Sequence, residues 1–118
     1  MNDKKKLGNI GETYACRILR NKGYRIIKRN VYIAKGEIDI ITRYKDMMVF
    51  VEVKSRSSDK FVDLLDSIDS AKSESLTLSC EEYLSRNNLD EISWRIDLIG
   101  LIIRRGKVLK VEHFKGII

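Results

Sequence analysis

The sequence predicts a mixed α/β layer protein whose elements follow the order αβββαββ. Two stretches carry apolar residues at the helical spacings of three and four, and five shorter stretches are rich in β-branched and aromatic residues. The 118 residues contain no proline and no Ser/Gly-rich linker, which predicts a single domain over residues 1–118. No segment approaches the roughly 18 uncharged apolar residues of a membrane span, so we expect no membrane partner.

The first helix is predicted over residues 8–22, where apolar residues form one stripe and Gly23 ends the pattern. Residues 24–33 are typical of a strand because β-branched and aromatic side chains dominate them. The basic pair Lys28-Arg29 and the turn-prone Asn30 interrupt this strand. We therefore expect a bulge within it.

A β-hairpin is predicted next, with strands over residues 37–43 and 47–54 joined by residues 44–46. The apolar run Val49-Phe50-Val51 indicates that the second of these strands is central and buried. Residues 55–60 are polar, and we expect a loop there.

The second half of the chain predicts one helix and two strands. Helical spacing runs over residues 61–86, with a break expected near Ser73. Residues 94–103 and 108–114 are typical of strands, and the short basic segment 104–107 predicts a tight connection between them.

The charge distribution favours a polyanionic partner. Lys and Arg total 23 against 17 Asp and Glu, which gives a formal net charge of +6. Ten basic and only two acidic residues lie within the first 35 positions. Nucleic acid is the expected partner because Lys and Arg neutralise phosphates, and the alternative is an ordinary basic surface. The candidate phosphate contacts are Arg17, Lys28, Arg29, Lys35, Arg56 and Lys72.

Cysteine usage and the start of the chain predict a cytoplasmic protein. Cys16 and Cys80 form no CxxC pair, and a small secreted scaffold normally carries four or more cysteines. We expect both to be buried free thiols. Residues 1–6 are charged and no apolar run follows them, so we expect no secretory signal.

Charged residues in the predicted hairpin suggest a cation site. Side chains alternate along a strand, so a two-residue loop would place Asp39 opposite Glu52 and Glu37 opposite Lys54, with all four on one face. Two facing carboxylates repel by roughly 4 kcal/mol at about 4 Å and an effective dielectric near 20. Mg²⁺ or Mn²⁺ would turn this repulsion into ligation, with the carbonyl of Val53 as a further ligand.

Two interpretations of these charges remain open at this point. Lys54 beside a cation would orient a water or offset charge on a phosphate. The alternative is a set of cross-strand ion pairs on a solvated sheet face. The apolar flanks of Glu52 indicate that this acid is partly buried, which favours a functional role.

Several motifs together resemble one protein family. Gly11-Glu12, Gly36-Glu37-Ile38-Asp39-Ile40-Ile41, Val49-Phe50-Val51-Glu52-Val53-Lys54 and Arg95-Ile96-Asp97-Leu98-Ile99-Gly100 occur in this order. The chain resembles the YraN family of small bacterial and archaeal proteins over nearly its whole length. That family is similar to restriction-endonuclease-like nucleases and to archaeal Holliday-junction resolvases.

The resemblance implies a restriction-endonuclease-like three-layer fold of the PD-(D/E)xK type, a central mixed sheet flanked by helices. It also implies a metal-dependent phosphodiester cleft. Asp39 and Glu52 match the metal-binding acids of this type, Lys54 matches its catalytic lysine, and Glu12 matches its acid on the first helix. Ile38 stands before Asp39, where the superfamily's name has a proline. Glu37 and Lys72 are weaker candidates for the site, and we expect Asp97 to make structural hydrogen bonds.

The expected function is therefore a Mg²⁺- or Mn²⁺-dependent endonuclease acting on DNA, on branched or single-stranded forms. A non-catalytic nucleic-acid-binding module and a protein-interaction module that keep the nuclease scaffold are the alternatives. Many nucleases of this fold pair two active sites by dimerising, so a homodimer is a candidate assembly, although the sequence assigns no surface to it.

Overall fold

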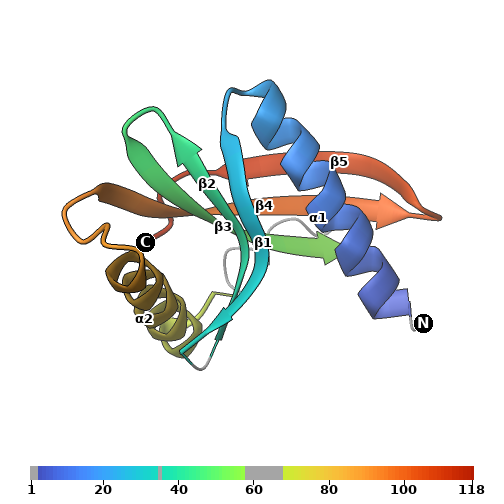
Figure 1. Cartoon of the computed structure of the whole chain (residues 1–118). Coiled ribbons are helices and arrows are strands. Elements are labelled where there is room, and N and C mark those ends of the chain that lie inside the picture. Colours follow the sequence, from blue (N-terminus) through green and yellow to red (C-terminus); the bar gives the residue numbers. More distant parts are fainter. Residues whose placement is uncertain (1–2, 35, 58–67) are drawn as a thin grey trace.

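A five-stranded mixed sheet forms the centre of the structure, a computed structural model that describes residues 3–34, 36–57 and 68–118 (Figure 1). The strands lie in the order β1-β2-β3-β4-β5. All neighbours are antiparallel except β3 and β4, which run parallel. The expected order αβββαββ is confirmed by helices α1 (Asp3–Asn21) and α2 (Ser70–Arg86) and strands β1 (Arg25–Ile33), β2 (Gly36–Tyr44), β3 (Met47–Arg56), β4 (Ser93–Arg104) and β5 (Lys107–Phe114).

The helices cover opposite faces of the sheet, which gives three layers (Figure 1). Ala15 and Leu19 of α1 pack against one face in a cluster that includes Val51. Leu76 of α2 packs against the other face in a cluster that includes Phe50. Each such fully buried large apolar side chain contributes about 1.5–3 kcal/mol, so both helices are anchored by their apolar stripes. The parallel pairing of β3 with β4 requires a crossover, and α2 lies in it.

Most of the expected elements are confirmed, including the bulge in β1, which lies between Ile26 and Lys28. The expected loop over residues 55–60 is wrong for its first two residues. Ser55 and Arg56 continue β3 because they pair with Leu101 and Ile102 of β4. Residues 58–60 lie outside the described ranges.

Helix α2 begins later than its apolar spacing predicts. The side chain of Asp69 caps the helix by accepting a hydrogen bond from the N–H of Lys72 at 2.9 Å. The break expected near Ser73 is wrong, since the N–H of Ser73 donates to the carbonyl of Asp69 within the first turn. The part of the predicted helix at residues 61–67 lies outside the described ranges.

Cys16 and Cys80 are buried free thiols, as expected, one on the buried face of each helix. Among the residues that the structure describes, no helix combines the length and apolarity needed to cross a membrane.

Candidate functional site

The candidate site lies where β2 separates from β3. Lys45 and Asp46 form the two-residue loop, and the ladder runs from Tyr44–Met47 as far as Ile40–Val51. Beyond this point, in place of a further ladder pair, the carboxylate of Asp39 accepts a hydrogen bond from the N–H of Val53 at 2.8 Å. The Asp39 side chain thus takes the place of the backbone hydrogen bond that would continue the ladder.

Strand β2 also twists at Asp39 so that its two faces exchange, a change that we call the turn-over of β2. Ile38 packs with the α2 side of the core and Ile40 with the α1 side, although regular alternation would put both on one face. The neighbouring Asn30 of β1 has a left-handed φ of 52°, which asparagine tolerates better than most residues. This local twist leaves the Asp39 carboxylate in the gap between the two strands.

Three carboxylates from α1 and β2 meet in this gap. One oxygen each from Glu12, Glu37 and Asp39 lies within 4.8 Å of the other two. Arg29 of β1 is the nearby cation, with its Nη2 atom 3.7 Å from Glu12 Oε1. That distance is too long for a hydrogen bond, and Glu12 Oε1 is buried without a hydrogen-bond donor among the described residues.

Glu52 of β3 is a fourth acid and, unlike the half-buried other three, is only 4% exposed. Its Oε1 atom lies 3.5 Å from the ammonium of Lys54 and 3.6 Å from that of Lys72 on α2. Its Oε2 atom is buried and accepts no hydrogen bond from the residues that the structure describes. The second oxygen of this carboxylate is therefore left for another partner.

The acids perturb one another. Burial and, after it, the negative charge of Glu52 raise the pKa of Asp39 to about 7, although the N–H of Val53 opposes both effects. Burial also raises the pKa of Glu12, an effect that Arg29 opposes and Glu37 reinforces. The site thus holds more negative charge than its own cations offset, which is the condition that favours cation binding.

The donor set fits a hard divalent cation. Carboxylate oxygens are the ligands that Mg²⁺ and Mn²⁺ prefer, and the site offers no sulfur or imidazole group among the described residues of the cluster. The buried oxygens of Glu12 and Glu52 that accept no hydrogen bond from the described residues also fit cation binding. A role for the carbonyl of Val53 stays a prediction.

The structure brings the acids together differently from the sequence prediction. The expectation that Glu37, Asp39, Glu52 and Lys54 share one face is wrong. Glu37 lies with Glu12 on the α1 side, while Glu52 and Lys54 lie with Lys72 on the α2 side. The cause is the turn-over of β2, which places Asp39 between the two groups.

Glu37 is the residue that sequence reasoning undervalued. Its spacing of two from Asp39 gave a signal, because such residues lie close along one strand. The approach of Glu12 from a separate helix is signalled by the family resemblance and not by that local spacing, which does not encode helix packing.

Two of the basic candidates contact the acids directly. Arg29 pairs with Glu12 and also donates to Thr13 Oγ1 at 3.5 Å, so it joins β1 to α1. Lys72, which is 40% exposed at its side chain, pairs with Glu52. Both cations therefore border the candidate site.

The remaining basic candidates lie farther out. The guanidinium of Arg17 sits over the ring of Tyr14, 5.9 Å from its centroid. Lys28 is exposed on β1, and Arg56 is exposed at the end of β3. Lys35 lies outside the described residues. Contact of these side chains with nucleic acid stays a prediction.

Comparison with known proteins gives a consistent set of relatives. A family model described as "Uncharacterised protein family UPF0102" matches residues 11–101, the span that holds all four acids. A UPF0102 protein of Syntrophotalea carbinolica is 37% identical over 93% of this chain and 89% of its own length. One of Chloroflexus aurantiacus is 39% identical over 93% and 90%. One of Flavobacterium psychrophilum is 38% identical over 98% and 95%.

Proposed function

The chain belongs to the UPF0102 (YraN) family, and from that premise we propose that it is a Mg²⁺- or Mn²⁺-dependent nuclease that hydrolyses DNA phosphodiester bonds. The substrate is branched or single-stranded DNA, and the protein acts in the cytoplasm. The observation that carries the proposal is the convergence of Glu12, Glu37 and Asp39 within 4.8 Å, next to buried Glu52 and its ion-pair partner Lys54.

In this proposal the carboxylates of Glu12, Glu37 and Asp39, which lie within 4.8 Å of one another, hold the cation, with Glu52 and the carbonyl of Val53 as further ligands. When bound, the cation would polarise the phosphate and lower the pKa of a water. The N–H of Val53 fixes the orientation of the Asp39 carboxylate, so this ligand is in place before a cation arrives.

The two lysines that pair with Glu52 have different roles. Lys54 is mostly buried beside Glu52, where its ammonium orients the attacking water and offsets negative charge on the phosphate. Lys72 is more exposed and reaches the same carboxylate oxygen from α2, so it contacts the substrate from the solvent side. Arg29 limits the repulsion between Glu12 and its acidic neighbours.

Cleavage of fluorescent duplex, flap and four-way-junction DNA with Mg²⁺ or Mn²⁺ tests the proposal. The Asp39→Ala and Glu52→Ala variants should each lose activity by at least about 100-fold because each removes a ligand. Glu112→Gln, at an exposed acid on β5, is the matched control and should retain activity. Metal-dependent cleavage that survives in both alanine variants would contradict the assigned site. Salt-sensitive DNA binding without turnover in either metal would favour the non-catalytic alternative.

A further inference from the structure

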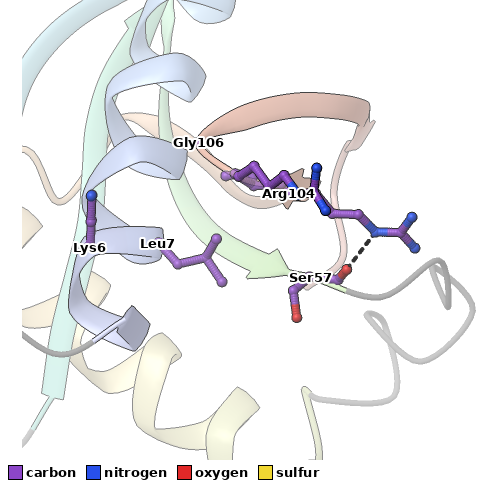
Figure 2. A pocket seen from close by; sticks show the side chains of 7 residues that line it. Lys6, Leu7, Ser57, Arg104 and Gly106 are labelled. Carbon is purple, nitrogen blue, oxygen red and sulfur yellow. Dashed lines mark hydrogen bonds between the residues drawn. The ribbon is translucent and has the colours of Figure 1, made fainter.

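A concave surface lies beside the first turns of α1. It encloses about 680 Å³ between the helix, the end of β3 and the turn that joins β4 to β5. Figure 2 shows Lys6 and Leu7 of the helix on one side and Arg104 and Gly106 of the hairpin on the other. We call it the basic pocket, and its lining is Lys6, Leu7, Ser57, Ile103, Arg104, Arg105 and Gly106.

The basic pocket combines positive charge with an apolar floor. Lys6, Arg104 and Arg105 supply three cations, and none of the lining residues that the structure describes is acidic. Leu7 and Ile103 supply the apolar part, and Ile103 is fully buried beneath. A nucleic-acid backbone complements this surface, because its phosphate is anionic and its sugar presents a largely apolar face.

The turn at the rim places an arginine where the backbone does not favour one. Arg105 and Gly106 are the two loop residues, and both have positive φ, 51° and 75°. Asn-Gly is the preferred pair for such a turn, because asparagine tolerates this conformation better than arginine. The Arg105 side chain is exposed at this turn, on the rim of the basic pocket.

The basic pocket and the candidate metal site are built on the same helix, α1, and the same strand, β3. Lys6 precedes Glu12 by six residues on α1, about 9 Å along the helix axis. Ser57 follows Glu52 by five residues beyond the same strand, about 17 Å along it. Between them Gly11 lies against Ser55, and a Cβ at Gly11 would collide with the Ser55 hydroxyl. Helix and strand are thus in direct contact between the two sites.

We infer that the basic pocket binds a backbone phosphate of the same nucleic acid, several nucleotides from the phosphate at the candidate metal site. Successive phosphates of one strand advance about 3.4 Å along a helical axis, so 9–17 Å corresponds to roughly three to five nucleotides. The sugar packs on Leu7, while Lys6 and Arg105 contact the phosphate. The inference rests on the proposed function, since it assigns a second contact to that substrate.

The test compares two double variants of equal charge. Lys6→Gln with Arg105→Asn removes two cations from the basic pocket, and asparagine suits the turn, so folding is preserved. Lys45→Asn with Arg43→Gln is the control. Lys45 also has a positive φ, 55°, in a two-residue turn, but that turn lies at the opposite end of the sheet. Each double variant lowers the formal net charge from +6 to +4.

The measurement is fluorescence anisotropy with a single-stranded oligonucleotide and a duplex, in EDTA so that no cleavage occurs. The salt concentration is varied between about 50 and 200 mM. The basic-pocket variant should reduce the slope of log K against log salt by about 0.7 per lost phosphate contact on the single strand. The control variant should keep the wild-type slope.

The outcomes separate the basic pocket from the proposed function. Equal slopes in the two double variants, or wild-type slopes in both, would overturn the basic pocket as a phosphate site. Binding by the wild type would in that case still support a nucleic-acid partner. If the wild type does not bind at the lowest salt, this result would contradict both the nucleic-acid partner and the phosphate site in the basic pocket. The Mn²⁺-induced rise in melting temperature should be the same in wild type and the basic-pocket variant, because that variant leaves the acids untouched.

Discussion

Two aspartates on different strands of the sheet, one fully buried and one half-buried, meet opposite environments. Asp97 of β4 is fully buried and accepts hydrogen bonds from Arg95 Nε at 2.9 Å, from the N–H of Gly116 at 2.8 Å and from His113 Nε2 at 2.8 Å. The ammonium of Lys22 lies 3.0 Å from His113 Nδ1, which identifies Nε2 as the ring atom that donates to Asp97. The expectation that Asp97 makes structural hydrogen bonds is confirmed.

Asp39 of β2 accepts one backbone N–H and otherwise faces other acids. Burial raises the pKa of each aspartate, but at Asp97 the donated hydrogen bonds and the Arg95 charge outweigh burial, so its pKa is lowered. At Asp39 the neighbouring Glu52 adds to burial, and its pKa is raised. Burial alone therefore does not mark a functional acid. A buried carboxylate that the chain leaves unneutralised does.

The largest effect is expected from breaking the satisfied aspartate. Asp97→Ala leaves Arg95 and His113 facing an empty buried position, so the free energy of unfolding should fall by about 3 kcal/mol or more. Urea unfolding at neutral pH measures it. Asp97→Asn keeps part of the hydrogen bonding and should lose less. An unfolding free energy unchanged in both variants would remove the structural role assigned to Asp97.

Asp39 should show the opposite sign. In EDTA at pH 8, Asp39→Asn removes a charge that burial and Glu52 disfavour, so the free energy of unfolding should rise by about 2 kcal/mol. Urea unfolding under the same conditions checks this, with Glu112→Gln as the control for loss of one acid. Destabilisation by Asp39→Asn would mean that the site already neutralises this carboxylate.

Glu37 tests how far the cluster extends. Its carboxylate joins Glu12 and Asp39 within 4.8 Å, so Glu37→Gln should weaken Mn²⁺ affinity by about tenfold while leaving the fold intact. Isothermal titration with Mn²⁺ measures this affinity, again against Glu112→Gln. Equal affinities for the two variants would exclude Glu37 from the site.

The pH dependence of stability separates the two aspartates most finely. The pKa of Asp97 is lowered in the folded state, so its contribution is present above the ordinary value of 3.8 and is lost as the pH falls through the lowered pKa. The pKa of Asp39 is raised to about 7, so its cost grows as the pH rises from about 4 to about 7. In EDTA, the gain in melting temperature from Asp39→Asn should vanish near pH 3.5 and be full near pH 8. A gain that is the same at both pH values would contradict the raised pKa.

Local patterns predicted the elements and much of the hairpin. The apolar stripe of α1 and the two-residue loop at Lys45 and Asp46 follow from spacing alone, and the register to Ile40–Val51 follows from that loop. The turn-over of β2 could not be predicted, because alternation assumes a continuous strand. The cluster around Asp97 joins Lys22, Arg95 and His113, residues far apart in the sequence whose proximity only the folded sheet creates.

Binding of a divalent cation by Glu12, Asp39 and Glu52 is tested most directly by thermal unfolding with and without Mn²⁺. A ligand that binds only the folded state stabilises it by about 2.7 kcal/mol at a concentration 100 times its Kd. The melting temperature of the wild type should therefore rise with Mn²⁺ concentration, and that of Asp39→Asn should not. A wild type that Mn²⁺ leaves unmoved, or an equal rise in both Asp39→Asn and Glu52→Gln, would contradict the site.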